Sequence, residues 1–424
     1  MRVVAFVAAA LLAGSAFAAD VCPVRVADPP PPQAADGSAL TTAGFKAWLA
    51  GFRSRALEAG VPAAIFDKAM KGVAFTPKTI ERAYNANERT QRIWDYLKNR
   101  PSPERLKTGK EMLAAHKAVL ARIEADTGIP PEVLVTFWGA ETDYGRNKGQ
   151  DDIFQAMAAL AYEGKRRDFY ENNLIAGMRI MQRTGFPKSK MVGSWAGAVG
   201  HAQFMPEAYL EYAVDGDGDG VIDLWDSVED AFASKANYLR ERNAKTPWRK
   251  GQAWIAEVQP PAGFAFEDGD LTIKKPVGSW TIRGVTLIGG GALTDLSGVA
   301  TDTPAAVFAP GGMRGPTVMT LPNFDRFVDY NPSQSYALAI ALWSNAIAGR
   351  PGLRTPWPVD EPDITRAQAY ALQKKLKALG HTDAEPDGDI GKGTRAAIRS
   401  YQLANGMVAD GFPSCALLKK VLAE

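Results

Sequence analysis

Apolar residues recur at helical spacing through most of the first 240 residues, and again from residue 333 onward. In an amphipathic helix the apolar positions lie three or four residues apart, so that they form one face. This spacing predicts helices over residues 45–57, 81–97, 106–126, 132–142, 153–162, 169–184, 206–213, 227–242 and 333–348. We therefore expect a mainly helical protein.

The pattern changes between about residues 245 and 324, where glycine and proline are frequent. Short runs there, such as residues 305–308 and 317–321, are rich in residues that favour strands. We expect a small β-rich insertion within the helical body. The predicted fold class is therefore mainly α (α+β).

A proline-rich linker marks the last domain boundary. Prolines cluster between residues 351 and 362, and such a segment separates units that fold on their own. The helical body then occupies residues 42–350. Residues 363–424 form a separate small domain.

The first 41 residues have the composition of an export signal followed by a spacer. Arg2 precedes an apolar run of about ten residues, and Ala16 and Ala18 offer the small side chains that a signal peptidase requires. The run is too short to span a bilayer. The sequence predicts a signal peptide at residues 1–18, a proline-rich segment at residues 19–41, and a soluble periplasmic protein without stable membrane insertion.

Charge and metal-binding residue types exclude several classes of function. Forty-nine Lys plus Arg against 47 Asp plus Glu leave a formal charge of +2, which offers no field for nucleic acid or an anionic membrane. Three histidines and two cysteines, far apart in the sequence, exclude a zinc finger, an iron–sulfur cluster and a His-rich zinc hydrolase. In an exported chain Cys22 and Cys415 form either a disulfide or two free thiols, and the sequence leaves both open. We expect a monomer.

Residues 215–226, DGDGDGVIDLWD, have the spacing of an EF-hand-like calcium loop. Carboxylates occupy positions 1, 3, 5, 9 and 12 of the loop, with a glycine at position 6 and an apolar residue at position 8. Hard oxygen ligands suit Ca²⁺, whereas the alternative is an acidic solvated turn. The last carboxylate is one methylene shorter than the usual glutamate. The predicted ligands of a structural Ca²⁺ are Asp215, Asp217, Asp219, the Val221 carbonyl, Asp223 and Asp226.

Glu141 is the candidate catalytic residue, because it lies at the end of a predicted helix whose other residues are almost all apolar. Burial against such a wall raises the pKa of a carboxyl group toward neutral pH. A carboxylic acid of that kind can protonate a glycosidic oxygen. Taken alone, a glutamate at a helix end is more often an exposed cap or an ion-pair partner.

Four motifs in one order strengthen this interpretation. ETDYG at residues 141–145 is followed by GSWAGAVGHAQFMP at 193–206, by the acidic loop with its Leu-Trp-Asp, and by YNPSQSYA at 330–337. In order and spacing they resemble the membrane-bound lytic transglycosylase B family, over about residues 45–348. The resemblance implies a lysozyme-like helical catalytic core.

The resemblance also implies an activity. The family cleaves the β-1,4 bond between N-acetylmuramic acid and N-acetylglucosamine of peptidoglycan without water, and leaves 1,6-anhydromuramic acid ends. Glu141 matches the acid that protonates the leaving oxygen and then, as a carboxylate, takes the proton of the muramyl C6 hydroxyl. No second catalytic carboxylate is needed, and Asp143 is interpreted as structural. The positions that match substrate-binding residues of the family are Ser194, Gln203, Tyr238, Tyr330, Asn331 and Tyr336.

The C-terminal unit resembles the small three-helix peptidoglycan-binding domain. The resemblance rests on a Leu-Gln helix near residues 371–376 and on Asp-Gly turns at 387–388 and 410–411. Such a domain would hold the enzyme on glycan strands and raise its effective concentration there. Two alternatives remain open: a muramidase that hydrolyses the same bond with water, and a catalytically inactive wall-binding protein.

Overall fold

The computed structural model of the chain describes residues 21–29, 39–84, 92–242 and 247–424. The predicted signal peptide and residues 19–20 and 30–38 of the proline-rich segment lie outside the described residues. Within the described ranges, no helix combines the length and the apolar character needed to cross a bilayer.

The body is helical, as the spacing of apolar residues predicts. Its helices begin mostly at Ser, Thr, Asp or Pro residues, which satisfy or omit the free N–H groups of a first turn. The helices of the body are α1 (Thr42–Glu58), α2 (Ala63–Met70), α3 (Pro77–Tyr84), α4 (Ile93–Asn99), α5 (Pro103–Ala115), α6 (Lys117–Thr127), α7 (Pro131–Thr142), α8 (Ile153–Glu163), α9 (Arg167–Thr184), α10 (Pro206–Tyr212), α11 (Val228–Glu241), α13 (Pro322–Tyr330) and α14 (Gln334–Ile347).

Two of the predicted helices are wrong in extent. The segment 81–97 is not one helix, because α3 ends at Tyr84 and α4 begins after Arg92, whose backbone is extended and whose guanidinium binds Asp95 and the Glu361 carbonyl. The segment 106–126 is interrupted at His116, where the chain turns so that the imidazole packs between two aromatic rings of the core. Helices α2 and α13 were not predicted from the spacing.

The β-rich insertion is confirmed as one antiparallel sheet in the order β4-β6-β7-β3-β5. Ile255 pairs with Thr320 and Phe308 with Val318 in this sheet, and a short helix, α12 (Val277–Ile282), lies within the same insertion. The strands are β3 (Ile255–Gln259), β4 (Lys275–Pro276), β5 (Thr286–Leu287), β6 (Pro304–Phe308) and β7 (Thr317–Thr320), and a separate pair in the body joins β1 (Asp151–Asp152) to β2 (Val192–Gly193).

The C-terminal domain has the three predicted helices, α15 (Arg366–Ala378), α16 (Lys392–Ala404) and α17 (Cys415–Ala423), around a small apolar core. The N-terminal segment 21–29 lies against this domain: Cys22 and Val24 accept hydrogen bonds from Gln368 at 2.7 and 2.8 Å. Cys22 also forms a disulfide with Cys415, which decides between the two alternatives that the sequence left open.

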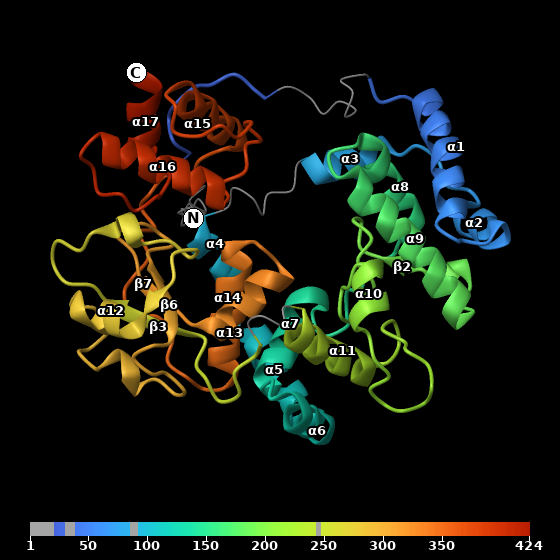
Figure 1. Cartoon of the computed structure of the whole chain (residues 1–424), viewed down its shortest axis with the longest axis horizontal. Coiled ribbons are helices and arrows are strands. Elements are labelled where there is room, and N and C mark those ends of the chain that lie inside the picture. Colours follow the sequence, from blue (N-terminus) through green and yellow to red (C-terminus); the bar gives the residue numbers. More distant parts are fainter. Residues whose placement is uncertain (1–20, 30–38, 85–91, 243–246) are drawn as a thin grey trace, which may run out of the picture.

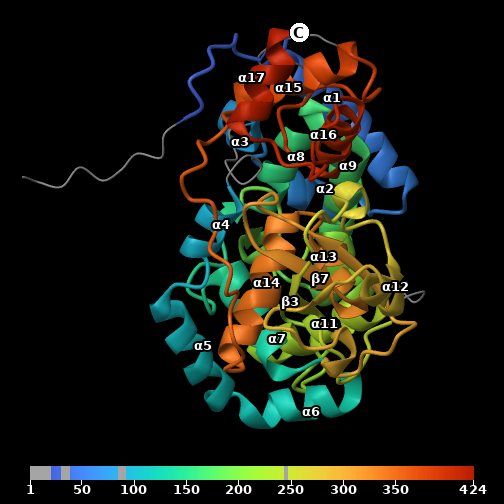
Figure 2. The same ribbon diagram turned by 90° about the vertical axis from the view of Figure 1, so that its left-hand side faces the viewer.

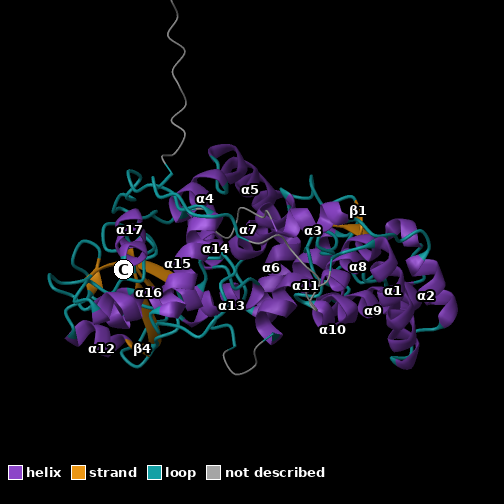
Figure 3. Ribbon diagram, turned by 90° about the horizontal axis from the view of Figure 1, so that it is seen from above, coloured by secondary structure: helices purple, strands orange, loops and turns teal. Residues whose placement is uncertain are grey.

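The three parts lie at defined places in the molecule. In Figure 1 the C-terminal helices lie above the sheet, while α1, α2, α8 and α9 form the opposite end of the body. Figure 2 shows the same vertical order, with α15–α17 at the top and α6 at the bottom. Seen from above, the strands of the large sheet gather at one end and helices fill the other (Figure 3). Helix α7 runs through the middle of the body, where it carries Glu141.

Candidate active site

Helix α7 positions Glu141 in its last turn. Pro131 occupies the first turn of the helix, where a missing N–H costs nothing. Nearly every residue between Val133 and Gly139 is buried, because α5, α6, α11 and α14 all pack against α7. With apolar contacts on every side, the helix has no freedom to shift. The place of Glu141 is therefore fixed by packing.

The carboxyl group of Glu141 is half-buried and faces two tyrosine hydroxyls. The Tyr336 hydroxyl donates to Glu141 Oε1, and the Tyr330 hydroxyl, which donates to the Ala202 carbonyl, also lies near the carboxyl group. Burial raises the pKa of Glu141, against the charge of Lys235 and the hydroxyls of the two tyrosines. Glu141 thus keeps its proton to higher pH than an exposed glutamate does. The pKa values of both tyrosines are raised by burial and by Glu141, so they stay neutral donors.

The tyrosines form one aromatic cluster beside the acid. The ring centroid of Tyr330 lies 5.0 Å from Phe137, 5.4 Å from Tyr238 and 5.9 Å from Tyr336. Tyr238 is 6% exposed and its hydroxyl donates to the Asp329 carbonyl at 3.3 Å. In this structure the buried ring of Tyr238 packs against Tyr330, whereas Tyr330 itself is half-buried and part of its surface is exposed.

Asp143 does not share the environment of Glu141. It lies just outside α7 and is the residue that ends the helix, with φ of 52°. Its carboxylate accepts from Arg105 Nε at 2.9 Å and pairs with Arg146 at 3.5 Å. Burial opposes ionisation, but the hydrogen bond and charge of Arg105 outweigh it and hold the pKa of Asp143 below its ordinary value. This supports the interpretation of Asp143 as structural.

A second loop, residues 193–204, brings Gln203 beside the turn that follows α7. The Gln203 amide donates to the Lys148 carbonyl at 3.1 Å, and the Gln203 carbonyl lies 3.4 Å from the Tyr330 hydroxyl. The two loops touch at Gly149, where a Cβ atom would lie 2.1 Å from the Gly193 carbonyl oxygen. Only glycine permits that approach, and its φ of +83° also favours glycine.

The structure brings Glu141, Gln203, Tyr238, Tyr330 and Tyr336 together. The other two predicted substrate-binding residues flank them and use their side chains in local turns. Ser194 Oγ accepts from the Ala198 N–H at 3.0 Å, and Asn331 Oδ1 accepts from the Ser333 N–H at 3.0 Å, just before α14 begins.

The sequence analysis missed one residue near the acid, Lys235. It lies on α11, is 3% exposed, and its charge faces Glu141. A signal was present, because Phe232, Lys235 and Leu239 follow the spacing of one helical face, and the first and last of these are apolar. A lysine on the apolar face of a helix is rarely buried without a partner.

The acidic loop follows α10, and three carboxylates come together there. Oxygen atoms of Asp215, Asp217 and Asp230 all lie within 4.8 Å of one another. Within the described part of the chain, no lysine or arginine forms an ion pair with these three. Asp219 and Val221 lie exposed at the tip of the loop, where Asp219 Oδ1 accepts from the Val221 N–H.

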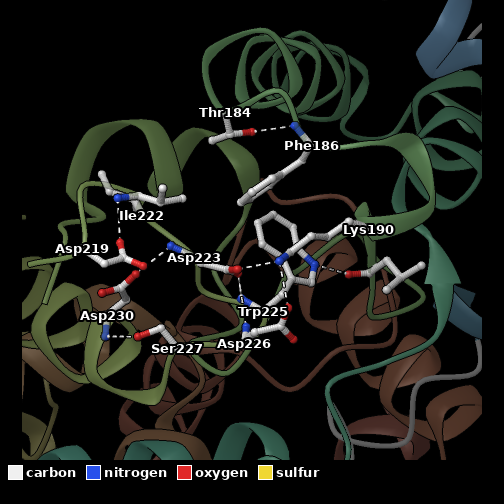
Figure 4. A network of polar contacts seen from close by, with 12 residues as sticks. Thr184, Phe186, Lys190, Asp219, Ile222, Asp223, Trp225, Asp226, Ser227 and Asp230 are labelled. Atoms are coloured by element: carbon white, nitrogen blue, oxygen red, sulfur yellow. Dashed lines mark hydrogen bonds and ion pairs between the residues drawn. The ribbon is translucent and has the colours of Figure 1, made fainter. Parts of the chain in front are cut away.

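Two of the predicted ligands have another partner in this structure. Asp223 and Asp226 pair with Lys190 at 2.5 and 2.8 Å, on the far side of Asp223 from Asp230 (Figure 4). Asp230, in the first turn of α11, lies with Asp215 and Asp217 instead and accepts from the Asp223 N–H at 2.6 Å. Asp230 was not among the predicted ligands, because Ser227-x-x-Asp230 is also an ordinary helix start.

A hollow of about 500 Å³ lies elsewhere, between α9 and α10. Its charged lining residues are Arg179, Glu207 and Glu211. None of the residues that converge on Glu141 lines it, so this hollow is separate from the candidate site.

Comparison with known proteins identifies this arrangement. Residues 44–345 match the model of the transglycosylase SLT domain. The chain belongs to the transglycosylase SLT family. Residues 365–420 match a putative peptidoglycan-binding domain, which agrees with the boundary predicted at residue 363. Membership of the SLT family confirms the lysozyme-like helical core and the separate C-terminal helical domain.

Three relatives of this SLT protein have names or structures that bear on function. It is 32% identical to membrane-bound lytic murein transglycosylase B of Escherichia coli over 60% of this chain, a match that spans 66% of that protein. It is 40% identical, with a TM-score of 0.81, to SltB3 from Pseudomonas aeruginosa in complex with NAG-anhNAM-pentapeptide, over 89% of this chain and 99% of SltB3. It is 26% identical, with a TM-score of 0.60, to Escherichia coli Slt35 in complex with calcium, over 71% of this chain and 92% of that one.

Proposed function

We propose that this SLT protein is a lytic transglycosylase that cleaves the β-1,4 bond between N-acetylmuramic acid and N-acetylglucosamine of peptidoglycan and leaves 1,6-anhydromuramic acid ends. The environment of Glu141 carries the proposal. One carboxyl group has a raised pKa and accepts from the Tyr336 hydroxyl, while the neighbouring carboxylate, Asp143, is held ionised by Arg105. A single acid that must first give and then take a proton needs such a setting.

The proposed mechanism uses Glu141 twice. Its protonated carboxyl group donates to the glycosidic oxygen of the leaving N-acetylglucosamine as the bond to the muramyl anomeric carbon breaks. The C6 hydroxyl of the same muramyl residue then attacks that carbon, and its proton passes to the Glu141 carboxylate. The tyrosine hydroxyls stabilise the carboxylate between the two steps. Atoms balance without water, and the acid is restored.

Product masses test this proposal. Purified sacculi digested with the protein should yield muropeptides with anhydro ends, which are lighter by one water than reducing ends. Glu141→Gln keeps the shape of the side chain and removes the proton, so it should lower the rate about a thousandfold. Sacculi should still bind this variant.

The alternatives give different results. Products with free reducing ends alone would identify a hydrolytic muramidase. Undiminished cleavage by Glu141→Gln would show that another group supplies the proton. Binding without any cleavage by the wild-type protein would identify an inactive wall-binding protein.

The C-terminal domain supports a role in substrate attachment. Its match to a putative peptidoglycan-binding domain suggests that it holds glycan strands near the catalytic body. We propose that the protein acts as a monomer in the periplasm, after removal of residues 1–18, since its substrate lies there.

We further propose that the acidic loop holds a structural Ca²⁺. The donor set fits: three carboxylates within 4.8 Å of one another supply the hard oxygens that Ca²⁺ prefers. Such an ion would offset the mutual repulsion of Asp215, Asp217 and Asp230. The acidic loop joins α10 to α11, and α11 is the helix that carries Tyr238 and Lys235.

A further inference from the structure

Lys235 is a buried cation with few polar partners. Its ammonium group donates to the Ala202 carbonyl at 2.9 Å, and this is its one hydrogen bond within the described residues. An ammonium group carries three donors, and burial of an incompletely paired charge is unfavourable. We therefore expect Lys235 to have a role that outweighs the unfavourable free energy of burying its charge.

Aromatic rings surround the ammonium group. Lys235 Nζ lies 3.5 Å from the ring centroid of Tyr330, 4.8 Å from Phe204 and 4.9 Å from Phe137. The faces of these rings attract a cation. The enclosed space beside it measures about 10 Å³, room for one water at most. The charge is thus held by aromatic faces and not by solvent.

The same ring joins Lys235 to the acid. The Tyr330 hydroxyl and Lys235 Nζ both donate to the Ala202 carbonyl, at 3.2 and 2.9 Å, and Tyr330 also faces Glu141. The charge of Lys235 is the strongest of the influences that oppose the raised pKa of Glu141. In return, burial lowers the pKa of Lys235 to about 7, against the pull of the Glu141 carboxylate.

We propose that Lys235 is a positioning residue whose buried positive charge stabilises the Glu141 carboxylate formed when the acid gives its proton to the leaving oxygen. This inference rests on the proposed function, in which Glu141 is that acid. Lys235 acts in its protonated form, which its pKa of about 7 leaves available at and below neutral pH, and it touches no substrate. Its charge lowers the energy of the state between the two proton transfers, in which Glu141 is a carboxylate.

Other ionisable groups face Lys235 and Glu141 from the neighbouring elements. They are Tyr238 on α11, Tyr330 and Tyr336 on α13 and α14, His201 in the 193–204 loop, and Arg100 before α5. Burial raises the pKa of Tyr238 to about 12 and lowers that of His201 to about 4, so both stay neutral near pH 7. The pKa values of Tyr330 and Tyr336 are also raised, whereas that of Lys235, about 7, lies close to neutral.

The pH profile of Lys235→Met tests the proposal. Methionine fills the aromatic surroundings without a charge, so the pKa of Glu141 should rise further. The alkaline limb of kcat/KM on a soluble glycan fragment should move up by about one pH unit, and kcat should fall roughly tenfold with little change in KM. Arg240→Gln is the matched control, because it removes a charge from the exposed face of the same helix and should leave the profile unchanged.

Two further variants separate charge from packing. Lys235→Gln also removes the charge and retains a donor for the Ala202 carbonyl, so it should move the alkaline limb of kcat/KM by the same amount. It replaces Lys235→Met if that variant fails to melt cooperatively. Lys235→Arg keeps the charge and should keep the limb near its wild-type position. A folded Lys235→Met or Lys235→Gln with an unmoved or lowered limb overturns the proposal, as does an equal shift in Lys235→Arg. Wild-type product masses report separately on the proposed function.

Discussion

Two carboxyl groups only two residues apart behave in opposite ways at the end of α7. Glu141 faces apolar walls and hydroxyls, and burial raises its pKa. Asp143 turns out of the helix toward Arg105, which holds its pKa below the ordinary value despite partial burial. Pairs of groups whose pKa values are pushed apart mark acid and base roles. Here they separate the proposed proton donor from a structural ion pair.

The ion pair of Asp143 makes a prediction about stability and pH. Its folded pKa lies below the unfolded value of about 3.9, so its stabilisation is complete above about pH 5 and fades as the pH falls through the folded pKa. Asp143→Asn should lower the free energy of unfolding by about 1 kcal/mol at pH 7. Urea melts from pH 7 to 3 should show the gap to wild type closing in acid. A gap that does not change with pH would contradict the assignment.

At the scale of residues, the sequence singled out a candidate site residue where a motif and the residues around it pointed to the same role. Glu141 was singled out as the candidate acid because an apolar helix and an ordered set of motifs pointed to one residue. Lys235 was not, because a lysine is ordinarily interpreted as exposed, and its aromatic neighbours Phe204 and Tyr330 come from distant segments. Asp230 was not proposed as a metal ligand, because an aspartate three residues after Ser227 is also what an ordinary helix start contains.

At the scale of elements, the turn after α7 depends on a contact between loops. Gly149→Ala would place a Cβ against the Gly193 carbonyl and force a side chain into a left-handed backbone conformation. We expect a loss of about 2 kcal/mol or more in stability, with reduced glycan cleavage because Gln203 is held to the same turn. Urea melts and a cleavage assay measure both.

Gly185→Ala is the matched control for Gly149→Ala. Gly185 ends α9 with φ of +74°, and nothing lies within 4 Å of its would-be Cβ. It should cost only about 1 kcal/mol and leave cleavage unchanged. Equal losses in the two variants would show that backbone strain, and not the contact between loops, is responsible.

The acidic loop makes a prediction about calcium. An ion that binds only the folded loop raises stability, by about 2.7 kcal/mol at a hundredfold excess over its Kd, so chelation should lower the thermal midpoint. Asp230→Asn should abolish the calcium-dependent part of the midpoint, whereas Asp226→Asn should retain it, since Asp226 pairs with Lys190. Scanning calorimetry with and without Ca²⁺ checks this. Loss of the calcium effect in Asp226→Asn alone would restore the ligand set expected from spacing.

Helix existence was easier to predict than helix ends. Apolar periodicity located α7, α9, α11 and α14 because each must bury one face. It did not show the interruption at His116, which has neither glycine nor proline beside it and arises from packing against Trp138 and Phe232. A break set by tertiary contacts leaves no local signal.

At the scale of the molecule, the C-terminal domain is attached to the body through side chains as well as through the linker. Arg399 on α16 pairs with Asp270 in the β-rich insertion, and both side chains are mostly buried. Asp410 accepts from the Met313 N–H at 3.1 Å. These contacts place the domain above the sheet, as Figures 1 and 2 show. They also hold the domain in one orientation relative to the body, so a glycan strand bound to the domain would approach the body from one direction.

The disulfide should stabilise this attachment, because it closes a loop between residues 393 positions apart. Cross-links that constrain the unfolded chain typically contribute about 2–4 kcal/mol. The double variant Cys22→Ser/Cys415→Ser should therefore unfold its C-terminal domain at a lower temperature, and binding to sacculi should weaken with it. Cleavage of a short soluble glycan should not change, because Glu141 lies in the body. Reduction of the wild-type protein should reproduce the effect. An equal loss of cleavage on soluble glycan would show that the domain contributes to the chemistry.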